Sequence, residues 1–251
     1  MRRFLCFNGP VWVVAWACAT ASGGPLIISE IVDSTLPGGL PKFVELTNTG
    51  SASIDLSLFS IGNFNNGNLE LGGGVSTILS GTIAAGDSYV ISYENGDSPG
   101  NGTFFDTYLF DPDFFGPGAV INGDDAVALF AGLAVTDGFG NLTGTVVDVY
   151  GIRGVDGTSE IWEYTDSYAV RNPGVMTGTS TFNAAEWTFG GTDFLETGDD
   201  PTELALILAN TTPGTHRLAT TAVPEPSALA LAGTGLLGIL ALGWQRRRHR
   251  I

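Results

Sequence analysis

Short strand-type segments alternate with turn residues along this chain, and this alternation constrains the fold more than any other feature. Turn signals such as Asn122–Gly123 and Asp137–Gly138 separate runs rich in valine, isoleucine, threonine and aromatic residues. Such spacing is typical of an antiparallel sandwich or barrel. A helical period is present at most over 202–209. We predict strands at 26–32, 42–48, 53–61, 87–93, 125–130 and 145–151.

Two of these segments show the period of two that places alternate side chains on one face of a strand. Ile54, Leu56 and Leu58 share a face of segment 53–61. Tyr89 and the two alternate residues after it share a face of segment 87–93. We therefore expect both faces to be buried.

The first 21 residues have the layout of a secretory signal peptide. Arg2 and Arg3 precede an apolar run, and small residues precede a predicted cleavage site after Ala21. The two cysteines, Cys6 and Cys18, both fall in this segment. The exported chain would therefore have no disulfide, no thiolate metal site and no cysteine nucleophile.

The C-terminal end combines an uncharged run with a basic terminus. Residues 227–244 contain no charge and, as a helix, would span about 27 Å, close to the roughly 30 Å core of a bilayer. Arg246, Arg247, Arg248 and Arg250 follow and would stay on the cytoplasmic side. We predict a linker at 219–226, a transmembrane helix at 227–244 and a cytoplasmic tail at 245–251.

The tetrapeptide Val223, Pro224, Glu225 and Pro226 stands directly before this helix. The tetrapeptide, the helix and the basic end together resemble the PEP-CTERM sorting signal of Gram-negative bacteria. The resemblance implies processing by an exosortase-type membrane protease, followed by transfer to the cell surface. It also implies association with extracellular polysaccharide or other surface proteins of a biofilm. The two prolines keep the motif extended, as a protease cleft requires.

The region between the two ends resembles the lamin-tail domain, an immunoglobulin-like β-sandwich. The resemblance rests on Ser29–Glu30, Val44–Glu45–Leu46 with Asn48, Asp55–Leu56 and Gly86–Asp87. The later stretches GDDAVALF, VVDVYG, EWTF and TPGTH fit the bacterial form, so coverage extends over about 25–218. We predict one all-β, antiparallel domain at 22–218, with long loops at 97–123 and 154–183. The resemblance implies an adhesive or interaction module and transfers no catalytic residue.

Charge is the most unusual feature of residues 22–222, which hold 25 acidic residues against four basic ones. Such a surface repels phosphate backbones, so nucleic acid is not expected as a partner. It attracts divalent cations, although an acidic surface also serves solubility alone. His216 is the one histidine between the two ends, and we expect it to lie exposed in a loop. Few requirements of a catalytic site are met, and we predict that the protein is not an enzyme.

Asp111, Asp113, Asp124 and Asp125 form the densest acidic region and are the candidate calcium ligands. The stretch from Asp111 begins like an EF-hand loop, but phenylalanine and asparagine replace ligands at its fifth and twelfth positions. An EF-hand is therefore excluded, while a looser site of carboxylates and carbonyls remains open. The alternative is that the aspartates after the Asn122–Gly123 turn are simply solvated.

Aromatic residues gather in the same region and would either stack on sugars or fill one end of the sandwich. We expect burial, because large exposed apolar patches are uncommon on soluble domains. A calcium-dependent carbohydrate-binding module is the alternative function, and a carboxylate-dependent hydrolase is the third. The residues concerned are Phe104, Phe105, Tyr108, Phe110, Phe114 and Phe115.

Overall fold

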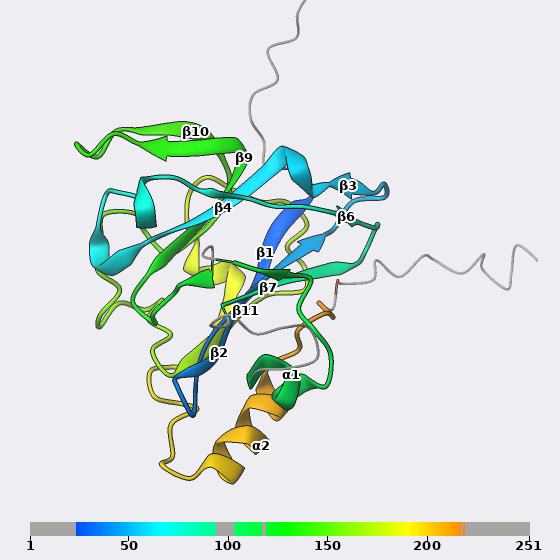
Figure 1. Cartoon of the computed structure of the whole chain (residues 1–251), viewed down its shortest axis with the longest axis vertical. Helices are drawn as coiled ribbons and strands as arrows, with labels where there is room; N and C mark the ends of the chain where they lie inside the picture. The colour runs from blue at the N-terminus through cyan, green and yellow to red at the C-terminus, as the bar shows by residue number, and fades with distance from the viewer. Residues whose placement is uncertain (1–23, 94–102, 117–118, 217, 219–251) are drawn as a thin grey trace, which may run out of the picture. The chain divides into compact units, whose positions relative to one another are not determined.

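The strands form two main sheets and a small two-stranded one (Figure 1). The computed structural model describes residues 24–93, 103–116, 119–216 and 218. Neighbouring strands are antiparallel, except that β8 runs parallel to β7. The six-stranded sheet has the order β12 (Trp187–Phe189), β11 (Ser167–Arg171), β1 (Leu26–Leu36), β2 (Leu40–Asn48), β7 (Ser88–Tyr93) and β8 (Phe114–Phe115).

The second main sheet is four-stranded, and its longest strands form a hairpin. Its order is β10 (Leu142–Tyr150), β9 (Ala126–Thr136), β4 (Phe59–Phe64) and β5 (Thr77–Ile78). The two-stranded sheet pairs β3 (Ile54–Asp55) with β6 (Thr82–Ile83). Short 3-10 turns are η1 (Leu56–Leu58), η2 (Asn65–Gly67), η3 (Gly72–Gly74) and η5 (Ala184–Glu186).

The main core lies between the two large sheets. Alternate residues of β2 and β7 point into this core, because successive side chains of a strand point to opposite faces, and they meet residues of β1, β4, β9 and β10 there. Tyr89 and Ile91 are buried in this core, and Tyr93 packs against it, as the alternation predicts. Tyr150 lies edge-on to Trp187, with ring centroids 4.7 Å apart. The predicted β-sandwich is therefore confirmed.

A second core covers the opposite face of the six-stranded sheet. The helices α1 (Thr103–Tyr108) and α2 (Asp200–Asn210) lie together against this sheet (Figure 1). Phe43 of β2 meets Phe104 of α1, and Ile207 of α2 belongs to the same cluster. The helical period at 202–209 is thus α2, which Asp199 caps by accepting a hydrogen bond from the Thr202 amide at 3.2 Å.

The predicted strand at 53–61 is wrong as a single element. The η1 turn divides it, and Leu58 is 63% exposed rather than on a buried face. The cause is Asp55, whose side chain accepts a hydrogen bond from the Ser57 amide at 3.0 Å and so favours a turn over a ladder. Leu56 alone keeps the predicted full burial.

The predicted loops contain elements that the sequence did not reveal. The stretch 154–183 holds β11, which pairs with β1 near the middle of the six-stranded sheet. The stretch 97–123 holds α1 and β8, and the parallel β8 departs from the purely antiparallel sheet expected. Strand β11 has only five residues, with burial on alternate positions, and such a short segment is a weak signal.

A buried ion pair joins the two main sheets. Arg171 of β11 donates to Asp148 of β10 at 3.0 Å, and both side chains are buried. Asp148 also accepts from the backbone amides of Ile28 at 2.8 Å and Thr179 at 2.9 Å. Glu186 accepts from the second guanidinium nitrogen at 2.6 Å. The charges are therefore paired, as burial in a low-dielectric interior requires.

The predicted signal peptide at 1–21, the motif at 223–226 and the helix at 227–244 lie outside the described residues. Within the described part of the chain, neither helix has the length and apolar character needed to cross a bilayer. The described residues up to His216 form one compact unit.

Candidate functional site

Two buried glutamates, Glu30 and Glu45, hold the end of the domain against the six-stranded sheet. Both carboxylate oxygens of Glu30 accept from the Thr212 amide, at 3.0 and 3.1 Å. Glu45 accepts from the Gly214 amide at 2.7 Å through one oxygen and from Ser29 at 2.6 Å through the other. We call Glu30, Glu45 and the segment 212–216 that they bind the C-terminal anchor.

Hydroxyl groups complete the C-terminal anchor. Thr47 donates to the Ser29 hydroxyl at 2.8 Å and lies 2.9 Å from the Ser88 hydroxyl. Ser88 in turn accepts from the His216 amide at 3.2 Å. Ser29, Glu30 and Glu45 belong to the lamin-tail-like signature, and the TPGTH stretch at 212–216 fits the bacterial form of that domain. The structure brings these motifs together, although they are far apart in the sequence.

Burial dominates the electrostatics of the C-terminal anchor, because Glu30 and Glu45 are each only 1% exposed. Loss of water raises the pKa of Glu45 to about 7, although its hydrogen-bond donors act in the opposite direction. Burial also raises the pKa of Glu30 well above its usual range, and the neighbouring charge of Glu45 raises it further. The two carboxylates therefore bind protons more tightly in the folded protein than in the unfolded chain.

His216 is half-buried rather than exposed, which corrects the expectation from its loop position. Its Nε2 atom is buried and has no hydrogen-bond partner among the residues that the structure describes. Burial lowers the pKa of His216, and the positive charge of Arg171 lowers it further. A neutral imidazole at this position is consistent with a packing role.

Three of the candidate calcium ligands have structural hydrogen bonds. Asp113 accepts from the Val90 amide at 2.8 Å. Asp124 accepts from the Asn66 side chain at 3.0 Å. Asp125 accepts from the backbone amides of Asn66 and Asn122, each at 2.8 Å.

These contacts show that two of the aspartates are not solvated. Asp124 is 8% exposed and Asp125 is 3% exposed, whereas Asp111 and Asp113 lie on the surface. Burial raises the pKa of Asp125 to about 6. The four side chains do not form one tight group among the described residues, and calcium binding by them stays a prediction.

A different acidic group is closer to metal-site geometry. The carboxylates of Asp166, Asp193 and Glu196 have oxygens within 4.8 Å of one another. Their loops are joined by two backbone hydrogen bonds, from Asp193 to Thr165 and from Leu195 to Asp166, each 2.9 Å long. Sequence reasoning missed this group, because its members come from two separate loops.

The predicted aromatic group is largely buried, as expected, but not at an end of the sandwich. Phe104 is fully buried. Its ring centroid lies 4.8 Å from that of Tyr108. Both rings belong to α1 and pack on Phe43 of β2, in the cluster that also contains Ile207 of α2. Phe105, Phe114 and Phe115 are half-buried, and Phe110 is 37% exposed. The packing of Phe104 and Tyr108 on Phe43 fits the burial expected of these two rings.

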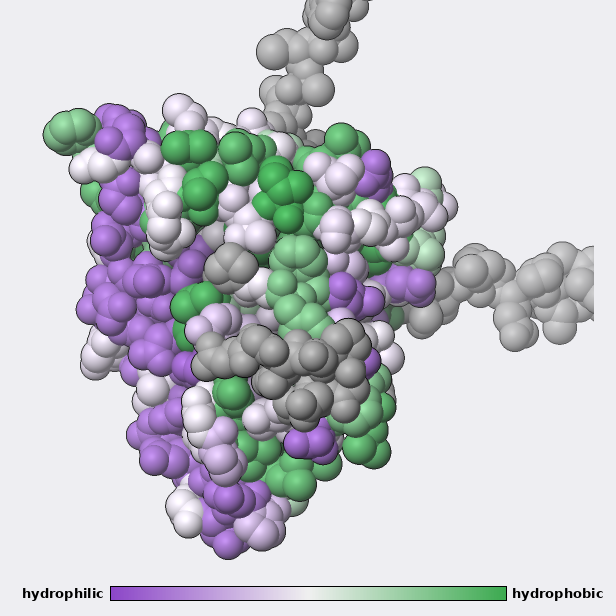
Figure 2. All heavy atoms as spheres, in the orientation of Figure 1, coloured by the Kyte–Doolittle hydropathy of each residue, from purple (hydrophilic) through white to green (hydrophobic). Residues whose placement is uncertain are grey.

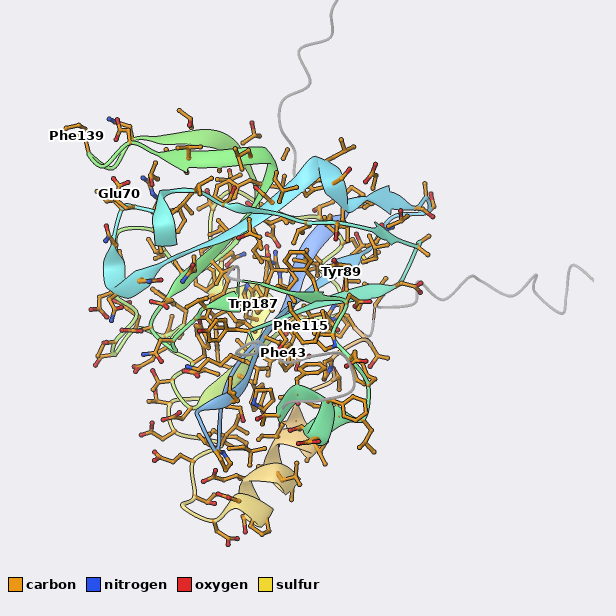
Figure 3. The ribbon with its side chains drawn as sticks, in the orientation of Figure 1. Phe43, Glu70, Tyr89, Phe115, Phe139 and Trp187 are labelled. Carbon is orange, nitrogen blue, oxygen red and sulfur yellow. The ribbon has the colours of Figure 1, made fainter. Side chains whose placement is uncertain are left out.

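Apolar side chains are exposed instead around the β9–β10 hairpin. Phe139 at its tip is 90% exposed and points away from the sheets (Figure 3). Figure 2 shows apolar residues over β4 and this hairpin, while hydrophilic residues gather along one side of the view. Leu133 and Val135 of β9 are among the exposed ones. Glu70 steadies the tip by accepting from the backbone amides of Gly138 and Gly140.

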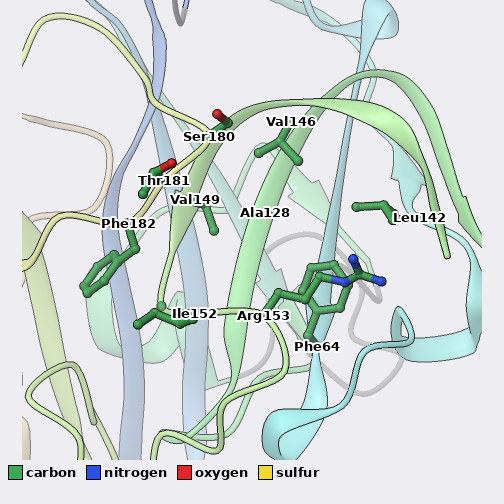
Figure 4. Close-up of a pocket in the computed structure, with 11 residues that line it drawn as sticks. Phe64, Ala128, Leu142, Val146, Val149, Ile152, Arg153, Ser180, Thr181 and Phe182 are labelled. Carbon is green, nitrogen blue, oxygen red and sulfur yellow. The ribbon is translucent and has the colours of Figure 1, made fainter. Parts of the chain in front are cut away.

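A pocket of about 380 Å³ opens beside the same hairpin (Figure 4). Ala128 and Val149 of the four-stranded sheet line it together with Phe64. Polar groups come from few residues, namely Ser180 and Thr181 on one side and Arg153 on the other (Figure 4). We call this cavity the Arg153 pocket. Sequence reasoning missed it, because its lining comes from four separate stretches of the chain.

Protein contacts fix the position of Arg153. Its Nε and Nη2 atoms donate to the carbonyl of Leu69 at 3.0 and 2.6 Å, and Nη2 also reaches the carbonyl of Gly140 at 2.5 Å. The guanidinium lies 5.2 Å from the ring centroid of Phe64. This stacking is a cation–π contact. Arg153 is thus pre-organised at the pocket.

These features define a β-sandwich domain with a helix-covered sheet and a C-terminal segment that is hydrogen-bonded to that sheet. The chain belongs to the lamin tail domain family, whose family model matches residues 19–154, more than half of the chain. The stretches EWTF and TPGTH lie beyond the matched residues, although Trp187 packs on Tyr150 and Gly214 binds Glu45 of the matched part. A second family model, the PEP-CTERM protein-sorting motif, matches residues 222–248.

Other comparisons add little to these two matches. A search of curated proteins finds no match. Among solved structures, a DUF4876 family protein from Bacteroides thetaiotaomicron is similar at 14% sequence identity and a TM-score of 0.35. The comparison covers 68% of this chain and 69% of that one.

Proposed function

We propose that this chain is an exported, exosortase-processed surface protein whose β-sandwich is a non-catalytic interaction module. The match of residues 222–248 to the PEP-CTERM sorting motif carries the proposal, because that motif implies export, exosortase processing and cell-surface localisation. The predicted signal peptide at 1–21 supplies the route across the inner membrane. The helix at 227–244 would hold the precursor there until cleavage.

The C-terminal anchor supports this order of events. Glu30 and Glu45 bind the segment 212–216, and only residues 217–222 separate His216 from Val223. Cleavage at or after the sorting motif would remove no described strand or helix of the sandwich. The released domain would therefore keep its fold.

The polar groups of the domain fit an interaction module better than they fit an enzyme. The paired carboxylates of Glu30 and Glu45 are buried and accept hydrogen bonds from the protein itself. A hydrolase would need such a pair open to substrate and water. The exposed apolar tip at Phe139 and the Arg153 pocket are instead accessible features of the kind that contact partners and ligands.

The sorting step is tested by changing the motif in a host that has a matching exosortase. Replacing Pro224, Glu225 and Pro226 with alanine should leave an uncleaved protein in the inner membrane. Replacing Thr220 and Thr221 with alanine changes the same linker without touching the motif, and should leave processing intact. Cell fractionation with an antibody to the β-domain reports both outcomes. Normal surface delivery of the first variant would contradict the proposal.

A further inference from the structure

The side chains that line the Arg153 pocket are mostly apolar and suit an apolar ligand group. Leu142 and Val146 of the hairpin, Ile152 and Phe182 surround the floor formed by Ala128 and its neighbours (Figure 4). Small-molecule sites are typically concave, mostly apolar and fitted with a few polar groups. At about 30 Å³ for each water-sized group, 380 Å³ holds roughly a dozen non-hydrogen atoms.

The charge at the pocket is positive, because Arg153 is the charged residue among the described residues that line it. Of the described cations, Lys42 pairs with Asp33 at 2.6 Å and Arg171 pairs with Asp148 and Glu186. Arg153 has no such carboxylate partner among the described residues, and no acidic side chain lines the pocket. Its Nη1 atom makes no hydrogen bond to the described residues, while Nε and Nη2 are engaged. One charged donor group is thus left for a ligand.

We propose that the Arg153 pocket binds a small organic carboxylate with an apolar body of aromatic or aliphatic character. The carboxylate pairs with Arg153, because charge-assisted hydrogen bonds to a carboxylate are the strongest that a guanidinium makes. The body fills the space above Ala128 and Val149 and removes apolar surface from water.

Other ligand classes fit this lining less well. A sugar carries hydroxyl groups around its ring, and the pocket offers Ser180, Thr181 and Arg153 as side-chain partners. Unpaired hydroxyls would be buried at a cost. A cation would meet the positive charge of Arg153 and no carboxylate. The net charge of −16 opposes any anion at long range, but salt near 0.1 M screens that field beyond about 10 Å.

The test compares 3-phenylpropanoate with 3-phenylpropan-1-ol, which share an apolar body and differ in the charged group. Titration calorimetry is done on the full chain in lipid nanodiscs, with empty nanodiscs as the blank and 0.15 M salt. The wild-type chain should bind the acid about tenfold more tightly than the alcohol. Equal binding of the two compounds, or binding of neither, would overturn the proposal.

Variants locate the binding. Arg153→Gln should weaken binding of the acid about tenfold and leave binding of the alcohol unchanged. Lys42→Gln removes the same charge at a described residue that does not line the pocket, and it should alter binding of neither compound. Val146→Trp should fill the pocket and abolish binding of both compounds. If Arg153→Gln does not fold, the wild-type comparison and Val146→Trp still decide; unchanged binding of the acid by Val146→Trp contradicts the site.

Discussion

The backbone amide of Gly214 donates a 2.7 Å hydrogen bond to the carboxylate of Glu45, 169 residues earlier in the chain. Glu45 lies on β2 and belongs to the residues that resemble the lamin-tail domain. The bond explains why an acidic residue occupies a buried strand position. It satisfies a backbone donor of a segment that belongs to no helix or strand. The C-terminal anchor thereby gives the sandwich a defined end before the sorting tail.

Residues 22–222, expressed alone, should fold as a soluble β-rich protein that reducing agents do not affect. The two cores and all described strands and helices lie before residue 217, and the cysteines lie before residue 22. Far-ultraviolet circular dichroism should show a sheet-dominated spectrum and a cooperative thermal transition, both unchanged by dithiothreitol. A helix-dominated spectrum would contradict the fold.

The stability of this fragment should depend on the protonation of Glu45. The folded pKa of about 7 exceeds the usual 4.5, so the group contributes stability that is fully present below about pH 4.5. That contribution is lost as pH rises through 7, and it amounts to about 3 kcal/mol at 1.4 kcal/mol per pKa unit. Glu45→Gln should therefore flatten the fall in the free energy of unfolding between pH 4.5 and 7.5.

Urea denaturation at several pH values measures this effect. Glu160→Gln changes an exposed glutamate and should keep the wild-type slope. A Glu45→Gln variant with the same pH slope as the wild type would show that the carboxylate is not the titrating group.

Arg171→Met should lower the free energy of unfolding by about 3–5 kcal/mol, because it leaves Asp148 buried without its cation. Arg171→Met combined with Asp148→Leu should cost less than the sum of the two single changes, since no fully buried charge is left unpaired and only the part-exposed Glu186 loses its cation. Denaturant midpoints of the three variants give the coupling energy. Strict additivity would mean that the pair contributes nothing to joining the sheets.

Gly123→Ala should destabilise the fragment by about 1–3 kcal/mol through overpacking. A Cβ atom at this position would lie 1.9 Å from the backbone of Thr165, so the two loops would have to separate. Gly174→Ala is the matched control, because nothing lies within 4 Å of its added carbon. Thermal melting compares the two variants. Equal melting temperatures would show that the Thr165 backbone does not lie against Gly123.

Sequence periodicity predicted the sandwich because burial on one face leaves a period of two, as along Tyr89 and Ile91. It failed where local side-chain bonds compete with the ladder, as at Asp55, and where a strand is as short as β11. The resemblance identified Glu30, Glu45 and the TPGTH stretch, but it did not predict the contact between them. Pairing between residues so far apart leaves no local pattern, and the Arg153 pocket escaped notice for the same reason.

The central claim is that the tail is a removable sorting signal after a domain that ends at the C-terminal anchor. Mass spectrometry of the surface-associated protein, from cells with the matching exosortase, tests it most directly. The C-terminal peptide should end before or near Ser227, with residues 212–216 retained. Recovery of surface protein that still carries residues 245–251 would contradict the account and make the tail a permanent anchor.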